Sequence, residues 1–313
     1  MIADAHCDTL MLLVGEHPKG TSLDQALPGH LDLPRLIAAG VGLQFFALFT
    51  VPDQGTDLGL RRILEMIAQF HRSVAQSEGR LYPVLTAADV VPQPGRVGGL
   101  LAVEGMRPLG GSVELLEVIH RLGVRSGMLT WNERNSLADG ALDQTSGGAL
   151  SAAGRRIVAA MQRLHMALDV SHLGERGFWD LLEQTEGPVL ASHSNVRALC
   201  DHPRNLTDEQ IKALAARGGV IGMNFYTQFL ASEGPVTLGT LLRHIRYISD
   251  LVGPQHVGLG SDFDGIGSAP DGLGSVADYP NLRGALDAAG FTAAEAEGIL
   301  GGNLRRALHT IFA

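Results

Sequence analysis

The chain has 313 residues, of which 45% are hydrophobic and 18% charged, and its mean hydropathy is +0.12. This apolar content suffices for a large buried core and excludes a largely disordered chain. The net charge of −9 and the lack of any basic run exclude an electrostatic surface for nucleic acid or for an anionic membrane. We therefore expect a small substrate or a soluble partner.

The first ten residues, MIADAHCDTL, contain neither the basic nor the apolar region of a signal peptide. No window approaches the roughly 18 uninterrupted apolar residues of a transmembrane helix. The two cysteines, Cys7 and Cys200, are too few for a disulfide framework. These features predict a cytoplasmic protein that is not attached to a membrane.

Short β-rich apolar runs alternate with segments of helical periodicity, and no Ser/Pro-rich linker interrupts them. In chain order the predicted strands are Ile2–His6, Leu43–Phe49, Gly99–Val103, Val124–Leu129, Ala167–Ser171, Pro188–Ser192, Val220–Asn224 and Val257–Ser261. Capping boxes at Thr207–Gln210 and Thr292–Glu295 open two of the helical segments. Eight strand–helix units predict an α/β protein with a (β/α)8 TIM-like barrel, formed as a single domain over residues 1–313. A doubly wound open sheet would alternate in the same way, so the polar residues must discriminate between the two.

Five of the predicted strands end in an acidic residue or a histidine. The segments are Asp4–Asp8, Val103–Gly105, Asp169–His172, Ala191–Ser194 and Gly260–Asp264. Because the C-terminal ends of barrel strands converge on one mouth, these residues become neighbours there. Carboxylate and imidazole groups gathered in this way are typical of a metal site.

The first of these segments supplies a ligand pair, and the second supplies a bridge. His6 and Asp8 alternate by two, so both side chains face the same side of an extended strand. Two cations roughly 3.5–4 Å apart repel each other unless an anion lies between them. Some hydrolases use a carboxylated lysine, but Lys19 lies in a loop and Lys212 on a helix. Glu104 is therefore the bridging candidate, and a role in capping the next helix is the alternative.

Three further residues are not predicted to be metal ligands. Cys7 lies between two predicted ligands but on the opposite face of the strand, so we expect a small buried thiol. Asp264 either caps the following loop or supports the site. His30, like the other histidines away from strand ends, is expected to have no metal contact.

The motifs DAHCD, AVEG, DVSH, SHS, HPRN and GLGSDFDG occur in this order. With them the chain resembles the membrane (renal) dipeptidase family, the zinc dipeptidases of peptidase family M19. The resemblance runs from residue 4 to about residue 305. It implies hydrolysis of small dipeptides with two Zn²⁺ ions per chain, and a homodimer. It does not include the anchoring tail of the mammalian members, so a membrane location is not implied.

The resemblance also implies a set of metal ligands. His6 and Asp8 would hold the first zinc ion, and His172 and His193 would hold the second. Glu104 would bridge the two ions, which makes it a catalytic residue as well as a ligand. All five residues lie in the strand-terminal segments described above.

Further residues would contact the substrate or handle protons. By resemblance, Arg204 of the HPRN segment would receive the substrate carboxylate, and Asp262 would handle a proton beside the bridging water. Mammalian members have a histidine where Trp131 stands. Because indole carries no positive charge, polarisation of the scissile carbonyl would rest more on zinc or on a neighbour such as Asn132. Tyr226 is a candidate for the pocket wall, although an ordinary rim tyrosine fits the pattern equally well.

The resulting hypothesis is attack on the peptide carbonyl by a hydroxide shared by two zinc ions, with Asp262 passing the proton to the leaving amine. Two alternatives stay open: another amidohydrolase-like barrel that acts on a cyclic amide or lactone, and a non-catalytic metal-binding homologue. The lack of a strand-terminal lysine disfavours the first, and the joint presence of the ligands, Arg204 and Asp262 disfavours the second. The sequence leaves open which dipeptides are cleaved, whether the C-terminal residue can be D, and whether β-lactams are substrates.

Overall fold

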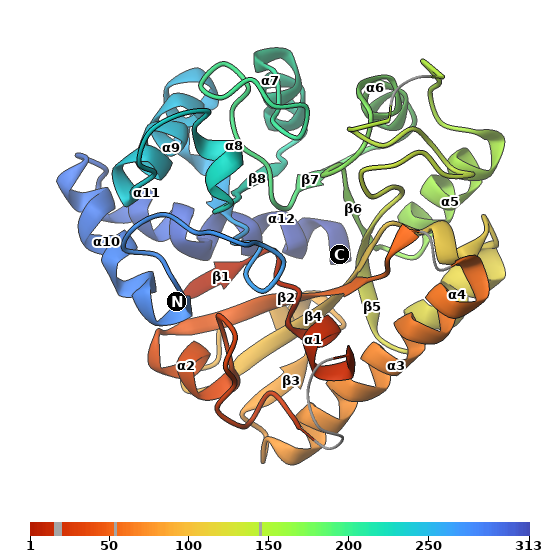
Figure 1. The fold of residues 1–313 in the computed structure, drawn as a ribbon, viewed down its shortest axis with the longest axis horizontal. Helices are drawn as coiled ribbons and strands as arrows, with labels where there is room; N and C mark the ends of the chain where they lie inside the picture. Colours follow the sequence, from red (N-terminus) through yellow and green to blue (C-terminus); the bar gives the residue numbers. More distant parts are fainter. Residues whose placement is uncertain (16–20, 53–54, 144–145) are drawn as a thin grey trace.

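The structure is a computed structural model that describes residues 1–15, 21–52, 55–143 and 146–313. Over these ranges the strands form one sheet in which all neighbours run parallel. The strands are β1 (Ile2–Asp4), β2 (Val41–Phe49), β3 (Leu81–Pro83), β4 (Val97–Glu104), β5 (Val124–Met128), β6 (Ala167–Asp169), β7 (Leu190–Ala191), β8 (Val220–Met223) and β9 (Val257–Leu259). Their order is β2-β1-β9-β8-β7-β6-β5-β4-β3, and an additional pairing of β2 with β4 closes the ring. The predicted parallel barrel is therefore confirmed, and β1, β2 and β4 to β9 are its eight strands (Figure 1).

One strand lies outside the ring. β3 pairs with the start of β4, where Leu81 is opposite Val97 and Pro83 is opposite Gly99. This strand was not predicted from the sequence, because three residues that end in proline give little alternation. Each of the eight predicted strands overlaps an observed strand, although most of the observed ones end earlier because the last polar residues belong to the following turns.

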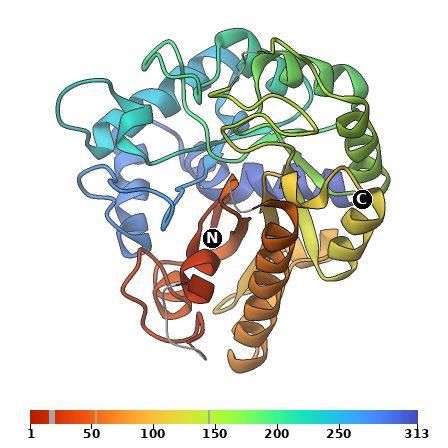
Figure 2. The same ribbon diagram turned by 45° about the vertical axis from the view of Figure 1, so that its right-hand side comes forward.

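Helices surround the ring in both views (Figures 1 and 2). They are α1 (Thr9–Gly15), α2 (Leu33–Ala38), α3 (Gly55–Gln76), α4 (Val113–Arg121), α5 (Ala152–Arg163), α6 (Glu175–Gln184), α7 (Asp208–Ala216), α8 (Thr227–Leu230), α9 (Leu238–Val252), α10 (Tyr279–Ala288), α11 (Ala293–Glu297) and α12 (Asn303–Phe312). Both predicted capping boxes are present, at the starts of α7 and α11. Within the described ranges, none of these helices combines the length and the apolar composition that crossing a bilayer requires.

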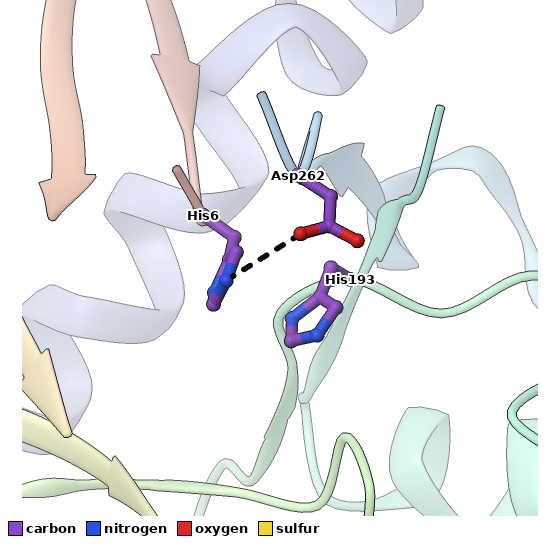
Figure 3. Close-up of side chains that lie close together, drawn as sticks. All are labelled: His6, His193 and Asp262. Carbon is purple, nitrogen blue, oxygen red and sulfur yellow. Dashed lines mark ion pairs between the residues drawn. The ribbon is translucent and has the colours of Figure 1, made fainter. Parts of the chain in front are cut away.

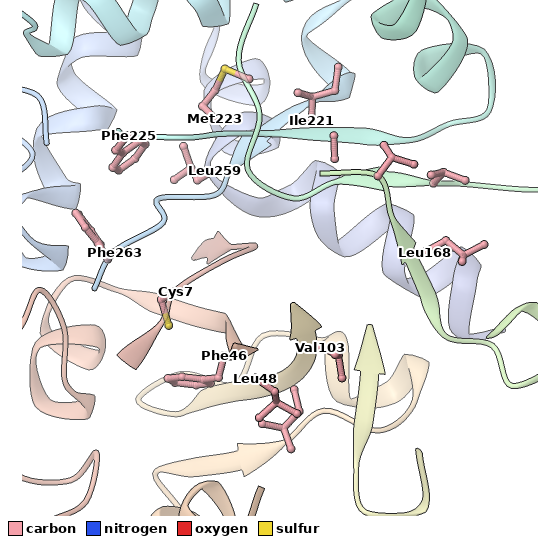
Figure 4. Packing of buried hydrophobic residues seen from close by; sticks show 14 of the residues in the cluster. Cys7, Phe46, Leu48, Val103, Leu168, Ile221, Met223, Phe225, Leu259 and Phe263 are labelled. Atoms are coloured by element: carbon pink, nitrogen blue, oxygen red, sulfur yellow. The ribbon is translucent and has the colours of Figure 1, made fainter. Parts of the chain in front are cut away.

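The alternation of side chains along β4 shows how the sequence builds the barrel. Leu100 and Ala102 belong to the apolar cluster inside the ring, whereas Leu101 and Val103 belong to the cluster between the strands and the helices. Figure 4 shows part of this outer cluster, including Val103. Since side chains alternate along a strand, Glu104 shares the inward face with Ala102 and ends the strand at the mouth.

The C-terminal helix α12 closes the opposite end of the barrel. Its residues Leu304, Ala307 and Leu308 are buried against Leu190 and Val220, which are the first residues of β7 and β8. Apolar packing by this helix therefore covers the N-terminal end of the strands. Figure 1 shows the course of α12. The C-terminal end, where the polar motifs lie, is left as the mouth.

Candidate active site and metal centre

The structure brings the five predicted ligands together at the mouth. His6 and Asp8 follow β1, Glu104 ends β4, and His172 and His193 follow β6 and β7. These strand ends lie at different positions around the ring, and all five residues are buried. They form two groups, His6–Asp8–Glu104 and Glu104–His172–His193, and within each group the candidate ligand atoms lie within 4.8 Å of one another.

Glu104 lies between the two groups. Its Oε2 atom is 3.4 Å from His6 Nε2, and its Oε1 atom is 3.1 Å from His172 Nε2. One carboxylate thus presents a different oxygen to each group. Two neighbouring cations require this arrangement, because the shared negative charge offsets their repulsion.

The residues present fit a bound cation. Both ring nitrogens of His6 and the Oδ1 atom of Asp8 lack a hydrogen-bond partner among the described residues. A buried polar group without a partner costs about 1–3 kcal/mol. A cation at this place would satisfy His6 Nε2, which faces Asp8 and Glu104, and Asp8 Oδ1. Nitrogen with carboxylate oxygen is a donor set that zinc accepts.

Burial and neighbouring charges shift the pKa values of the cluster. Burial lowers the pKa of His6, but the carboxylates of Glu104 and Asp8 raise it well above its ordinary value. Burial and the Glu104 charge raise the pKa of Asp8 to about 6. Burial, together with nearby cationic groups, holds the pKa values of His172 and His193 well below the ordinary histidine value. These two rings are therefore neutral, as metal ligation requires, while a cation would displace protons from His6 and Asp8.

Asp262 joins the cluster from the segment after β9. Its Oδ1 atom lies 3.7 Å from His6 Nε2, and Figure 3 shows both side chains converging with His193. Asn224 Nδ2 donates a hydrogen bond of 2.8 Å to Asp262 Oδ2. Burial, with the neighbouring carboxylates, raises the pKa of Asp262 to about 7. A carboxyl group with this pKa can both accept and donate a proton near neutral pH.

Arg204 is a buried cation at the edge of the cluster. It is 3% exposed, and its guanidinium donates to the His193 carbonyl at 3.3 Å. In the described part of the chain its Nε atom has no partner and no carboxylate lies within ion-pair distance. Burial lowers its pKa to about 10, so the group is still charged at neutral pH. A buried, unpaired guanidinium is a binding site for an anionic group.

A cleft of about 210 Å³ opens above these residues. It is lined by Asp8, Met11, Phe49, Glu104, Trp131, Asn132, His172, Arg204, Tyr226, Phe229, Asp262, Gly265 and Ile266. Its floor is charged, whereas much of its wall is aromatic or apolar. Small-molecule sites combine a few polar groups with apolar walls in this way.

All four residues proposed from the sequence as substrate contacts, Arg204, Trp131, Asn132 and Tyr226, line the cleft. The Trp131 ring stacks on His172 with a centroid distance of 5.9 Å. Asn132 Oδ1 lies 2.8 Å from His172 Nδ1, so its amide oxygen contacts a predicted metal ligand. Tyr226 packs edge-to-face against Phe229.

Sequence reasoning missed the support around Asp264. His30, which was expected to lie away from the centre, donates to Asp264 Oδ1 through its backbone N–H at 2.6 Å. Thr9 Oγ1, next to the predicted ligand Asp8, donates to Asp264 Oδ2 at 2.5 Å. Asp264 therefore ties the segment after β9 to the start of α1, which favours support of the site over simple loop capping. No spacing signal could have shown this, because more than two hundred residues separate the partners.

The remaining expectations concern a thiol and the lysines. Cys7 Sγ lies 3.2 Å from the Phe45 carbonyl oxygen and is buried, as the strand alternation predicted. Lys212 lies on α7, away from the strand ends. Lys19 and His17 lie outside the described residues.

Comparison with known proteins agrees with these features. The family model described as membrane dipeptidase (peptidase family M19) matches residues 1–312. Dipeptidase aclJ of Aspergillus oryzae is 35% identical over 295 residues, which cover 90% of this chain and 70% of that protein. The match thus extends over nearly the whole barrel.

Solved structures show the same relationship. A metallopeptidase of Rhodobacter sphaeroides, crystallised with a phosphinate mimic of the dipeptide L-Ala-D-Ala, superposes with a TM-score of 0.91 at 29% identity and covers 100% of this chain and 99% of its own. Dipeptidase AC, a metallopeptidase of family M19, has a TM-score of 0.88 at 30% identity, with 99% and 98% of the two chains covered. The chain therefore belongs to the membrane dipeptidase family, peptidase family M19, and is a metallo-dipeptidase of that type.

Proposed function

We propose that the chain is a zinc dipeptidase that binds two Zn²⁺ ions at the barrel mouth. His6 and Asp8 hold one ion, His172 and His193 hold the other, and Glu104 binds both. The observation that carries this proposal is the placement of the two Glu104 oxygens, 3.4 Å from His6 Nε2 and 3.1 Å from His172 Nε2. The Nε2 atom of His6, which has no hydrogen-bond partner and faces both carboxylates, supports it.

The side chains around the cleft account for the chemistry. His6, Asp8, Glu104, His172 and His193 would hold a pair of zinc ions, which would supply Lewis acidity and lower the pKa of a bound water molecule. Asp262, whose pKa is raised to about 7, accepts a proton from the nucleophile and returns it to the leaving amine. Asn224 holds the Asp262 carboxyl through its 2.8 Å hydrogen bond.

Arg204 explains a restriction to dipeptides. Its buried guanidinium would pair with the C-terminal carboxylate of the substrate. This contact would supply the anionic partner that the guanidinium lacks in the described part of the chain. Because this cation lies beside the metal ligands, only a short peptide can place both its carboxylate and its scissile bond correctly. Trp131 and Tyr226 line the remaining walls.

We include dipeptides with a D-residue at the C-terminal side among the substrates. The Rhodobacter sphaeroides relative was crystallised with a mimic of L-Ala-D-Ala, and it superposes over the whole chain. An L-Xaa-L-Xaa and L-Xaa-D-Xaa panel tests this point directly.

The main experiment is hydrolysis of that panel by purified protein with its bound metal quantified. Turnover should require metal, stop with a chelator and return with Zn²⁺. A protein that holds two zinc ions but turns over no dipeptide would contradict the substrate assignment. A protein that binds no metal would contradict the metal centre.

Replacement of Arg204 tests the carboxylate contact. Arg204→Ala should raise KM for dipeptides by about 100-fold, because charge-assisted hydrogen bonds contribute about 1.5–3 kcal/mol each. Arg204→Lys keeps the charge but not the paired geometry, so its KM should fall between those of the wild type and the alanine variant. Steady-state kinetics at fixed zinc measures both, and an unchanged KM in Arg204→Ala would remove the residue from this role.

A further inference from the structure

The backbone at His172 needs an external restraint. Its φ angle is 68°, in the left-handed region that residues with side chains rarely adopt. Two hydrogen bonds hold its carbonyl oxygen, one from Thr130 Oγ1 at 3.1 Å and one from the Ala141 N–H at 2.8 Å. One of these two donors belongs to the segment that directly follows β5.

The same segment fixes the imidazole of His172. Asn132 Oδ1 lies 2.8 Å from His172 Nδ1. Since an amide oxygen only accepts hydrogen bonds, this contact favours the tautomer of the neutral ring that has its proton on Nδ1. The Nε2 atom then carries the lone pair, and it lies 2.8 Å from His193 Nε2 and 3.1 Å from Glu104 Oε1, beside the two other residues of its candidate metal group. This is the tautomer that can bind a cation through Nε2.

Trp131 restrains the ring from its face. Its indole stacks on the His172 imidazole with an interplanar angle of 29°, and Phe49 packs on the other part of the indole at 5.3 Å between centroids. An indole cannot polarise a carbonyl as an imidazolium does, but it can limit rotation of a neighbouring ring. Packing gives Trp131 a role that needs no charge.

The segment is itself held in place. The Leu142 N–H donates to the Asn132 carbonyl oxygen at 3.0 Å. Gly140 packs so closely against that carbonyl that a Cβ atom would not fit. Asn135 Nδ2 donates to the Leu129 carbonyl oxygen at 2.8 Å, just before the segment. The amide of Asn132 thus comes from a backbone that is fixed on both sides.

We propose that residues 130–132 form a clamp on His172, in which Asn132 is a positioning residue that sets the tautomer of this ring for the second zinc ion. The inference rests on the two-zinc site proposed above. His193 has a different arrangement, because Ser192 Oγ, 2.8 Å from its Nδ1, can donate as well as accept. The Asn132 contact therefore constrains the His172 ring more strictly than the Ser192 contact constrains the His193 ring.

The test compares two substitutions at one position. Asn132→Leu keeps a similar shape but removes the acceptor, whereas Asn132→Asp keeps an acceptor oxygen. Zinc binding is titrated in competition with a chromophoric chelator, after the wild-type protein has been shown to bind two ions. Asn132→Leu should lower the affinity for one of the two zinc ions by about 10- to 100-fold and leave the affinity for the other unchanged. Asn132→Asp should restore the affinity to within a few-fold, and Glu133→Gln, at the exposed neighbour, should match the wild type.

Kinetics give a second readout. The kcat of Asn132→Leu should keep rising with the zinc concentration over a range in which the kcat of the wild type is already constant. Asn132→Ser, whose hydroxyl is too short to reach His172, serves as the acceptor-free variant if Asn132→Leu does not fold.

Three results would overturn the proposal. Unchanged zinc affinity in the acceptor-free variants, with a raised KM, would make Asn132 a substrate contact instead. An Asn132→Asp protein as weak as Asn132→Leu would show that the acceptor oxygen does not matter. A wild-type protein without two zinc ions would overturn both this inference and the proposed function, whereas failure of the inference alone leaves the wild-type titration intact.

Discussion

Three non-glycine residues at the barrel mouth have a left-handed backbone. They are His172, Asp262 and Asp264, with φ angles of 68°, 63° and 67°. Such conformations cost of the order of 1–3 kcal/mol each and persist only where surrounding contacts hold them. Hydrogen bonds from Thr130, Asn224 and Thr9 supply that restraint. The strain is concentrated where side chains must turn from the strand ends toward one point.

A single substitution tests whether Asp262 transfers protons. Asp262→Asn keeps the shape and the neighbourhood of the carboxyl but removes its ability to carry a proton near pH 7. If Asp262 transfers protons, kcat should fall by about 10²- to 10⁴-fold while two zinc ions stay bound. Metal content and kcat are measured on the same sample, and loss of zinc in this variant would identify Asp262 as a ligand instead.

His244 gives a pH prediction that does not involve the metal centre. The ring is buried, accepts a hydrogen bond from the Val196 N–H at 3.1 Å and lies 3.0 Å from the Leu230 carbonyl oxygen. Burial lowers its pKa to about 4, even though the Leu230 contact opposes the shift. The folded protein therefore keeps this ring neutral, while the unfolded chain takes up a proton below about pH 6.5. Stability from this group is present above pH 6.5 and is lost as the pH falls toward 4.

His244→Gln should reveal this contribution. At pH 8 the variant should be less stable by about 1–3 kcal/mol, because buried groups lose their hydrogen bonds. At pH 5 the difference should shrink by about 2 kcal/mol, since the wild type alone has the protonation penalty. Chemical denaturation of both metal-free proteins at the two pH values measures the difference. Parallel pH profiles would contradict the assigned pKa.

At the scale of the elements, glycines allow the strand ends to approach one another. A Cβ atom at Gly222 of β8, or at Gly260 just after β9, would overlap the carbonyl oxygen of Ser192. Ser192 directly precedes the proposed ligand His193, and Gly260 is two residues before Asp262. The close contact of β7, β8 and the segment after β9 therefore sets the spacing between His193 and Asp262.

Gly260→Ala tests this spacing. The added methyl group must displace backbone, so the variant should lose more than about 2 kcal/mol of stability and bind zinc less tightly. Gly284→Ala is a matched control, because this position lies within α10 with no atom close to its Cβ and should gain about 0.4–1 kcal/mol. Thermal unfolding and zinc titration are compared for both variants. Equal stability of the two proteins would show that the strands can absorb the methyl group.

Periodicity and strand-terminal motifs were enough to predict most of the barrel, because each strand carries its own local signal. β3 was missed, since Leu81–Pro83 is too short to alternate. The five ligand candidates could be named from motif and resemblance, yet the distances between them depend on how eight strands close into a ring. The contact of Asn132 with His172 and the anchoring of Asp264 by His30 depend on loop paths, for which the sequence contains no periodic signal.

At the scale of the whole molecule, the two ends of the barrel are closed by different forces. At the N-terminal end, α12 packs Leu304, Ala307 and Leu308 into the inner cluster. At the mouth, buried carboxylates and imidazoles from β1, β4, β6 and β7 lie together. Without a cation, the carboxylates of Asp8 and Glu104 are offset mainly by His6, whose pKa they raise. With cations bound, the mouth becomes a cross-link between strands on different sides of the ring.

Removal of metal should therefore lower the melting temperature. Binding that is restricted to the folded state contributes about 2.7 kcal/mol per site at a free ion concentration of 100 times Kd. For a chain of this size, two such sites correspond to a shift on the order of 8 °C. Because Asp8 must lose its proton to bind a cation, and its pKa is about 6 without one, the shift should be larger at pH 8 than at pH 5.

Leu308→Ala separates the two ends in the same experiment. This substitution leaves a cavity against the inner cluster and should lower stability by about 2–5 kcal/mol with or without metal. The chelator-induced shift should nevertheless equal that of the wild type, because sites that do not touch contribute additively. Calorimetry of both proteins, with zinc and with chelator, gives the four melting temperatures. A chelator shift that disappears in Leu308→Ala would mean that the two ends are coupled, and that the closure of the ring by α12 is a condition for assembling the metal centre.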